Sequence, residues 1–422
     1  MDCLGDKNMK CIWIVVNRLQ PAYLSCYGSE WLDTFTLDRL ATEGIVFDQC
    51  YVDRASPIAV RRSWFTGRHG FGGPSRTPGL LRLLWEQGVR TVFIGDERSP
   101  SIRGVWASGW EMVQVVRRNR LTELEQESLT AGCIQAATDW LSRYAASDPW
   151  LLWLELGALQ PPWESALYDH DAVRALEGAP EQPILEPKIG RVGVDLTKEE
   201  REVLLYSYAG VVSGVDQWLG MLLDFLRGKG VYDEVLLVVT SDCGLPLGEH
   251  GLVGDVGVCL HEELVHLPLL LRWPGGKEAG RRIQQLVQPV DFFPTLLEYF
   301  AATIPQEIHG KSILGLARGE YVQLREYACS IGRFGVEEWW ALRTHQWYLI
   351  LPARGLPDRP IPPPQLYIKP DDRWEVNDVR EDYPDAAEHL ELTLRRFREA
   401  ARQNRLAELP ELRDDLLRIT VE

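Results

Sequence analysis

The sequence predicts an α/β fold: a large, mainly parallel central sheet flanked by helices, followed by a small C-terminal α+β subdomain. Short β-rich runs alternate with helical patterns, and such alternation is typical of crossover connections and a buried parallel sheet. The chain has 422 residues, and one α/β sheet commonly takes up about 250 residues or more. Near residue 325 the pattern changes to short strands and a charged helix, which indicates a separate, smaller unit.

Several apolar, β-rich runs are expected to form strands of the central sheet. They are Cys11–Val16, Val46–Val52, Thr91–Ile94, Trp150–Leu156, Val235–Thr240 and Leu267–Arg272. Two helices are expected to begin with a capping box, in which a Thr is followed three residues later by a Glu. One begins at Thr122 and the other at Thr197, and the second carries an apolar stripe over residues 204–226. A stripe with this spacing packs one helix face against a sheet.

The domain organisation follows from changes in residue pattern along the chain. Residues 157–195 contain five prolines and no clean period, so we expect a long loop over one edge of the sheet. We assign residues 1–325 to the large α/β domain and residues 326–422 to the subdomain, which should hold a short antiparallel sheet and a helix. Within it, Pro352–Pro364 is a rigid, proline-rich run and Ala386–Asn404 has the pattern of a charged helix.

Composition restricts the classes of partner and the compartment. The net charge of −16 opposes binding to nucleic acid or to an anionic membrane surface, because both would be repelled at long range. The first apolar run, Cys11–Val16, is too short for the core of a signal peptide or a membrane span, so a cytoplasmic protein is expected. Eight cysteines without paired spacing predict free thiols rather than disulfides.

Sequence motifs of a known family recur in order along nearly the whole chain. The first group lies within Asp33–Arg68 and includes Thr36-Leu37-Asp38-Arg39-Leu40-Ala41 and Ser63-Trp64-Phe65-Thr66-Gly67-Arg68. Later matches are Ser241-Asp242, Leu247-Gly248-Glu249-His250-Gly251-Leu252, Arg272-Trp273-Pro274-Gly275 and Gly310-Lys311-Ser312. Together they resemble the sulfatase family of the alkaline-phosphatase superfamily. The resemblance implies the alkaline-phosphatase-like fold of that family, in agreement with the strand and helix pattern.

The resemblance also implies a divalent cation, but the matching positions have changed. In the family, two Asp residues after the first strand and a later Asp followed by His or Asn bind the ion through hard oxygen ligands. The corresponding residues here are Asn17, Arg18, Asp242 and Cys243. An Arg cannot ligate a cation, since it carries its own charge and offers no lone pair. We therefore expect no metal cofactor; the alternative is one divalent cation held by new ligands.

The family's catalytic groups are replaced as well. Its nucleophile falls on Pro57, one residue after Ser56, whereas the arginine of the same motif is kept as Arg61. Its Lys and His after the third strand fall on Asp96 and Arg98. Proline cannot be a nucleophile, and neither a nucleophile nor a general acid is left at these positions. Ser56 would serve only if the alignment slid by one residue, and a Ser before Pro commonly starts a turn.

Two internal ion pairs are predicted at the altered positions. We expect the guanidinium of Arg18 to replace the cation and to pair with Asp242, because a buried carboxylate without a counter-charge is costly. Asp96 and Arg98 are expected either to pair with each other or with Arg61, or to lie in a solvated loop.

Two further sets of residues are candidates for ligand binding. Several arginines cluster in sequence around the former nucleophile and would suit an anion pocket that needs no metal; they are Arg54, Arg61, Arg62 and Arg68. Soft sulfur and imidazole ligands would suit zinc, and the residues concerned are Cys243, His250, Cys259 and His261. Their spacing matches no familiar zinc motif, so zinc is the weaker of the two hypotheses.

The sequence predicts a catalytically inactive pseudosulfatase that acts by binding an unknown ligand or a protein partner, and neither nucleic acid nor a membrane. The alternative is a sulfate- or phosphate-ester hydrolase with a rebuilt site that uses Arg61 and Asp242 with Ser56 or Cys243. A third interpretation is a structural partner of an active paralogue. The fold alone does not decide between these functions.

Overall fold

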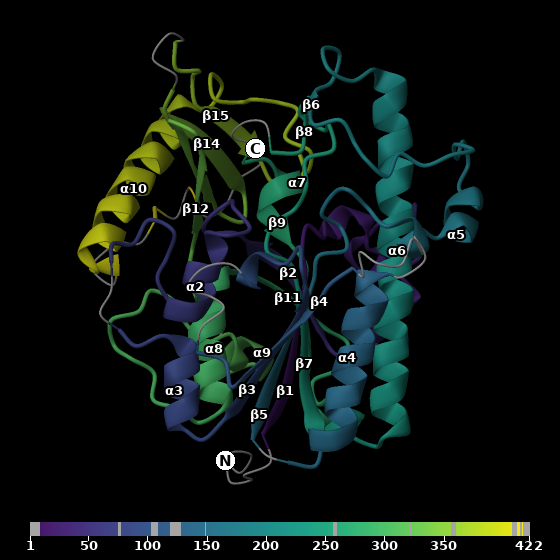
Figure 1. Cartoon of the computed structure of the whole chain (residues 1–422). Coiled ribbons are helices and arrows are strands. Elements are labelled where there is room, and N and C mark those ends of the chain that lie inside the picture. The colour runs from purple at the N-terminus through teal and green to yellow at the C-terminus, as the bar shows by residue number, and fades with distance from the viewer. Residues whose placement is uncertain are drawn as a thin grey trace.

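The computed structural model describes most of the chain. The described residues are 9–74, 77–102, 109–118, 128–147, 149–255, 260–320, 323–355, 360–406, 412–413 and 416. They form a large central sheet between two layers of helices and a small second sheet covered by one long helix (Figure 1). This arrangement agrees with the predicted α/β fold and its smaller C-terminal unit.

The central sheet is mixed but mainly parallel. Its strands, in spatial order, are β11 (Arg281–Val287), β2 (Ile45–Tyr51), β10 (Leu269–Arg272), β7 (Val235–Thr240), β1 (Lys10–Val16), β5 (Trp150–Leu156), β3 (Arg90–Asp96) and β4 (Met112–Val116), and β9 (His266–Leu267) also pairs with β2. The strand β1 lies parallel to β5 and β7, whereas β10 runs antiparallel to β7 and β2. The carboxyl ends of β1, β3, β5 and β7 therefore meet at one edge of the sheet.

The strand predictions hold in the middle of the sheet and fail at its borders. Every residue of β1 and β5 is buried, because helices cover both faces of a parallel sheet and its inner strands are continuously apolar. The two border strands were not predicted. In β4, Met112 is exposed, and β11 contains Arg281, Arg282, Gln284 and Gln285. Border strands are partly solvated, so they lack the apolar run by which inner strands are recognised.

Helices cover both faces of the central sheet (Figure 1). One face carries α1 (Phe35–Glu43), α4 (Leu129–Tyr144) and α6 (Lys198–Gly228), and the other carries α2 (Val60–Thr66), α3 (Leu80–Glu86), α8 (Phe292–Tyr299) and α9 (Leu314–Ala317). The capping box of Thr197 and Glu200 is present at the start of α6, as predicted. The one expected at Thr122 lies outside the described residues; α4 is instead capped by Ser128, whose hydroxyl accepts from the Ala131 amide.

The predicted loop 157–195 contains secondary structure and packs along α6, and its first residues lie at the carboxyl edge of the sheet, where Gly157 donates to Asp96 and Glu164 pairs with Arg98. It includes α5 (His170–Arg174) and β6 (Gly190–Arg191), which pairs with β8 (Leu252–Val253). The close approach depends on glycines of α6: a Cβ at Gly214 would lie 1.8 Å from the Leu167 carbonyl oxygen. The prolines of residues 157–195 indicated an irregular segment. The glycines against which this segment packs lie in α6, so the composition of the segment itself did not reveal the contact.

The sheet of the C-terminal unit begins with β12 at Ala328. Its antiparallel sheet consists of β12 (Ala328–Phe334), β13 (Glu337–Arg343), β14 (Trp347–Arg354) and β15 (Gln365–Ile368). The helix α10 (Pro384–Gln403) covers one face of this sheet (Figure 1) through the buried side chains of Leu390, Leu394 and Phe397. Pro352, expected in a rigid run, instead lies within β14 opposite Trp339, at a shift in register.

Two predictions about the whole chain can be compared with the described residues. The six cysteines in the described ranges are free thiols, as the irregular cysteine spacing indicated. None of the described helices is both long enough and apolar enough to cross a membrane.

Candidate functional site

Polar residues from several elements meet at the carboxyl edge of the central sheet. Asn17 and Arg18 follow β1, Asp242 follows β7, and Glu155 is the penultimate residue of β5. The side chain of Arg61 reaches them from α2, a helix on the opposite face of the central sheet from α6. Parallel strands bring their carboxyl ends to one edge, and this topology assembles residues that lie far apart in the sequence.

Arg61 is the centre of this site. One terminal nitrogen of its guanidinium donates to Glu155 and the other pairs with Asp242 at 3.2 Å. Its Nε donates to the Ser101 hydroxyl at 2.8 Å. The side chains of Arg61, Glu155 and Asp242 have an exposed fraction of 0%. A buried cation with two carboxylate partners is neutralised within the protein and is closed to an external anion.

The carboxylate of Asp242 is saturated by donors. Its Oδ2 accepts from Asn17 Nδ2 at 2.9 Å and from Arg61. Its Oδ1 accepts from the backbone amides of Arg18 at 3.0 Å and Cys243 at 2.9 Å. A carboxylate that accepts several charged and neutral donors has no oxygen left over for a metal ion.

The predicted pairing of the Arg18 side chain with Asp242 is wrong. The guanidinium of Arg18 instead pairs with Asp255 and donates to the Gly244 carbonyl at 3.1 Å. Arg18 has a φ of 68°, and in this left-handed conformation its amide faces Asp242 while its side chain reaches past the strand ends. Asp242 already receives its counter-charge from Arg61, so a second guanidinium is not needed.

Asp96 and Arg98 form an internal ion pair, one of the two arrangements expected. Arg98 Nη2 lies 3.1 Å from Asp96 Oδ2 and 3.4 Å from Glu164 Oε1. The Asp96 carboxylate also accepts from the backbone amides of Arg98 at 2.8 Å and Gly157 at 2.9 Å. The negative charge of Asp96 is therefore already paired within the protein.

The residues at the family's cation position do not fit a divalent cation. Asn17 turns its Nδ2 toward Asp242 and, at 3.4 Å, toward Glu155, so its amide acts as a donor there. One oxygen each of Asn17 and Glu155 lacks a hydrogen-bond partner among the described residues. Both nevertheless belong to side chains that surround the Arg61 guanidinium, whose positive charge would repel a metal ion.

The former nucleophile position offers no reactive group. Pro57 lies in the turn before α2, and Ser56 accepts a long hydrogen bond of 3.4 Å from the Ala59 amide, which is the role of a turn-forming Ser.

The other candidate nucleophile, Cys243, has its Sγ 3.5 Å from Arg18 Nη1. Complete burial raises the pKa of the Cys243 thiol well above its ordinary value, so the thiolate required of a nucleophile or metal ligand is disfavoured.

The four arginines expected to form one anion pocket do not come together. Arg61 belongs to the buried network, and Arg68 binds the Glu307 carbonyl at 2.9 Å and the Asn404 side chain. Arg54 and Arg62 do line one cavity together, on a different side of α2. The sequence cluster therefore divides among three separate environments: Arg61 and Arg62 are successive residues of α2 and point in different directions, whereas Arg54 precedes and Arg68 follows this helix.

The candidate zinc ligands are also separated. Cys243 belongs to the cluster around Arg18, and Cys259 lies outside the described residues. His250 and His261 do meet, near Glu375. Their rings stack with centroids 3.6 Å apart and planes 8° from parallel. A metal ion lies in the plane of each imidazole that binds it, so two parallel planes at this separation cannot share one ion without rearrangement.

Three acidic partners in this region were missed by reading the sequence. Glu155 pairs with Arg61, Glu164 with Arg98, and Asp255 with Arg18. Glu155 did carry a signal, since it is the only charged residue in the apolar run Trp150–Leu156, and a charge in a buried strand needs a partner. Glu164 and Asp255 lie in loops whose composition gave no such indication.

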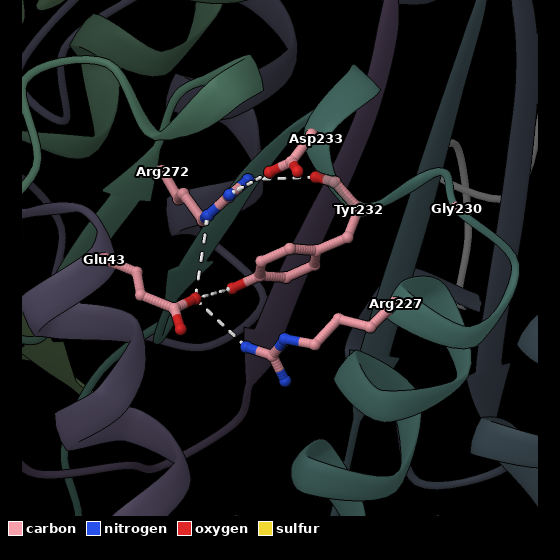
Figure 2. Close-up of a pocket in the computed structure, with 6 residues that line it drawn as sticks. All are labelled: Glu43, Arg227, Gly230, Tyr232, Asp233 and Arg272. Carbon is pink, nitrogen blue, oxygen red and sulfur yellow. Dashed lines mark hydrogen bonds and ion pairs between the residues drawn. The ribbon is translucent and has the colours of Figure 1, made fainter.

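A separate surface hollow of about 340 Å³ lies at the opposite edge of the sheet, between the ends of α1 and α6 and β10 (Figure 2). The Tyr232 ring lies between the guanidinium groups of Arg227, at 4.2 Å, and Arg272, at 3.8 Å. Glu43 accepts from Tyr232 and Arg227, while Arg272 pairs with Asp233. The four charged side chains of the hollow are therefore paired with one another.

Comparison with known proteins agrees with this architecture. Residues 10–302 match the sulfatase family. The chain is 27% identical, over an alignment of 479 positions, to N-acetylglucosamine-6-O-sulfatase of Bacteroides thetaiotaomicron, with 89% of this chain and 81% of that protein covered. It is 26% identical over 212 residues to arylsulfatase K of Canis lupus familiaris, with 47% of this chain and 38% of that protein covered.

Solved structures show the same fold. A protein in complex with its substrate D-glucosamine-2-N,6-O-disulfate superposes with a TM-score of 0.75 at 19% identity, covering 95% of this chain and 100% of the other. The phosphonate monoester hydrolase of Agrobacterium radiobacter superposes with a TM-score of 0.74 at 18% identity, covering 93% and 96%. The predicted alkaline-phosphatase-like fold is confirmed. Since the family match spans more than half of its residues, the chain belongs to the sulfatase family.

Proposed function

We propose that this member of the sulfatase family does not hydrolyse sulfate esters and acts by binding a ligand or a protein partner. One observation carries the proposal. The guanidinium of Arg61, with an exposed fraction of 0%, occupies the strand-end site together with Glu155 and Asp242. A substrate anion would have to displace two carboxylates from a buried ion pair before it reached this guanidinium, at a cost of several kcal/mol.

The chemistry of the neighbouring residues supports the proposal. Hydrolysis of an ester needs a nucleophile and a group that neutralises the leaving oxygen. Pro57 supplies no nucleophile, and Asp96 adds a negative charge where the family has a positive one. The relatives carry the names of sulfatases and of a phosphonate monoester hydrolase. Their activities rest on their own site residues and not on the shared fold.

Metal content and turnover test the proposal on the purified full-length protein. After dialysis without chelator, elemental mass spectrometry is expected to find no stoichiometric calcium, magnesium or zinc. With each of these ions added back, para-nitrophenyl sulfate and para-nitrophenyl phosphate should be hydrolysed no faster than in buffer. Co-purification with an active sulfatase would identify the binding role as that of a structural partner.

The matched variant Asp242→Asn makes the test decisive. It keeps the shape of the side chain but removes the charge that a bound cation would require. Stoichiometric metal together with turnover, both lost in Asp242→Asn, would overturn the proposal and establish a hydrolase with a rebuilt site. Trace turnover that is unchanged in Asp242→Asn would come from a contaminant and would leave the proposal standing.

A further inference from the structure

A basic cavity of about 630 Å³ lies between the C-terminal unit and the segment that follows α2. Its lining residues come from α10, from β12, β13 and β14 of the small sheet, and from α2 with the segments before and after it; Figure 1 labels these elements. Six arginines line it: Arg54, Arg62, Arg333, Arg354, Arg398 and Arg402. The acidic residues of the lining are Glu337 and Glu338. This concentration of positive charge is notable in a chain whose net charge is −16.

Backbone carbonyl groups hold two of these arginines without neutralising them. Arg62 Nη1 donates to the Gly72 carbonyl at 3.0 Å, and Nη2 donates to the Gly73 carbonyl. Arg54 donates in the same way to the Gly70 carbonyl. These bonds fix the direction of each guanidinium and leave its remaining N–H groups and its full charge available to a ligand.

The acidic side chains of the cavity neutralise only part of this charge. Glu338 is engaged by Arg333 Nε at 2.6 Å and by the indole nitrogen of Trp340 at 2.8 Å. Arg398 stacks on the Trp340 ring at 4.7 Å, which orients it without cancelling its charge. Six guanidinium groups thus face two carboxylates in the cavity.

Burial lowers the pKa of two of the lining arginines, and the charges of neighbouring arginines add to this effect. Burial, together with the charges of Arg62 and Arg333, lowers the pKa of Arg54, although nearby Asp53 opposes the shift. Burial and the charge of Arg68 likewise lower the pKa of Arg62. A bound anion would supply a counter-charge to these buried guanidinium groups.

We propose that this cavity binds a small polyanion that carries two or more phosphate or sulfate groups. Guanidinium groups match the oxygen geometry of both anions in bidentate fashion. The arginines come from several separate elements, so a single anionic group would leave most of them without a partner. The volume suits a ligand of drug-like size, and the phosphates or sulfates would be held without any metal.

The proposed site is distinct from the one occupied by Arg61. Although Arg61 and Arg62 are neighbours in α2, Arg61 reaches the strand ends and Arg62 reaches the Gly72 carbonyl. Binding in the arginine-lined cavity is therefore independent of whether the strand-end site has any hydrolytic activity. Failure of one proposal leaves the other standing.

Isothermal titration calorimetry of the full-length protein tests the proposal at near-physiological ionic strength. Myo-inositol hexakisphosphate and sucrose octasulfate are the two probes, and inorganic phosphate and inorganic sulfate are the single-group references. We expect at least one polyanion to bind with 1:1 stoichiometry and more tightly than either inorganic ion, with an affinity that falls as salt is raised. Preference for the first probe would identify phosphate groups, and preference for the second sulfate groups. Absence of binding by both polyanions would overturn the proposal.

Variants on one helix show where the probe binds. The double variant Arg398→Ala, Arg402→Ala removes two lining guanidinium groups and should weaken binding about tenfold or more. Arg396→Ala is the matched control, because Arg396 is an exposed residue of α10 outside the cavity lining, and binding should be unchanged. Arg354→Gln, in β14, removes a lining charge without touching the helix and should also weaken binding. Equal affinity for all these variants and the parent would show that the probe binds elsewhere and would overturn the proposal.

Discussion

The buried network around Arg61 makes a sharp prediction for the variant Arg61→Met. Methionine has a similar length and no charge, so the substitution leaves the carboxylates of Glu155 and Asp242 buried without their cation. Both carboxylates have an exposed fraction of 0%, and water cannot replace the lost donors without opening the core. The hydrogen bond to Ser101 at 2.8 Å is lost as well.

The size of the effect follows from these contacts. Removing one partner of a buried ion pair costs about 3 to 5 kcal/mol, and the additional hydrogen bond is worth about 1 kcal/mol. We therefore expect Arg61→Met to lower the free energy of unfolding by about 4 kcal/mol or more, a large part of the total for a natural domain. Urea unfolding followed by circular dichroism, with coincident fluorescence as a check of two-state behaviour, measures this value.

The double variant Arg61→Met, Glu155→Leu tests whether the loss comes from the ion pair. It removes the unpaired carboxylate of Glu155, while Asp242 keeps its bonds from Asn17 and two backbone amides. The double variant should recover stability relative to Arg61→Met, with a coupling energy of about 2 kcal/mol between the two sites.

Arg62→Met is the matched control for this experiment. Arg62 is the next residue of the same helix but binds only backbone carbonyl groups among the described residues, so its loss should cost about 1 kcal/mol. The reasoning fails if Arg61→Met costs no more than this control. It also fails if the effects of Arg61→Met and Glu155→Leu are simply additive.

Three further predictions concern stability. Partial burial would raise the pKa of Glu43, but hydrogen bonds from Tyr232 and arginines lower it to about 2. The ionised Glu43 side chain therefore contributes fully to the free energy of unfolding above its ordinary pKa, and this contribution is lost as the pH falls through 2. Glu43→Gln should cost about 1 kcal/mol near neutral pH and less near pH 3, as measured by urea unfolding at both values. Burial lowers the pKa of His69 to about 3, so the folded state excludes a proton that the unfolded state binds below its ordinary pKa of 6.5, and stability should fall between these values as the solution is acidified. The slope should approach about 1.4 kcal/mol per pH unit and become shallower in His69→Gln, and an unchanged slope would contradict the assignment. Thr197→Ala removes the hydroxyl that caps α6 and should lower the free energy of unfolding by about 1 kcal/mol, whereas Thr138→Ala, at a half-buried position within α4, should have a much smaller effect.

The sequence predicted the parts of the fold that depend on local pattern. The inner strands β1, β5 and β7 appear as apolar runs because both faces of a parallel sheet are covered. The start of α6 was predicted from Thr197 and Glu200, which satisfy donors within one turn. Through its resemblance to the sulfatase family, the sequence also predicted that Pro57, Asn17 and Arg18 occupy the family's nucleophile and cation positions, and this assignment stays a prediction.

The tertiary structure decided which charges meet. Arg18 was expected to neutralise Asp242, yet its left-handed backbone directs only its amide there and Arg61 supplies the charge. The arginine-lined cavity joins residues from Arg54 to Arg402, across most of the chain. Secondary structure and motif positions are recorded in residue order, so the sequence by itself determined them. Ion pairs and charged cavities depend on through-space distances of a few ångströms between separate elements, and only the folded chain sets those distances.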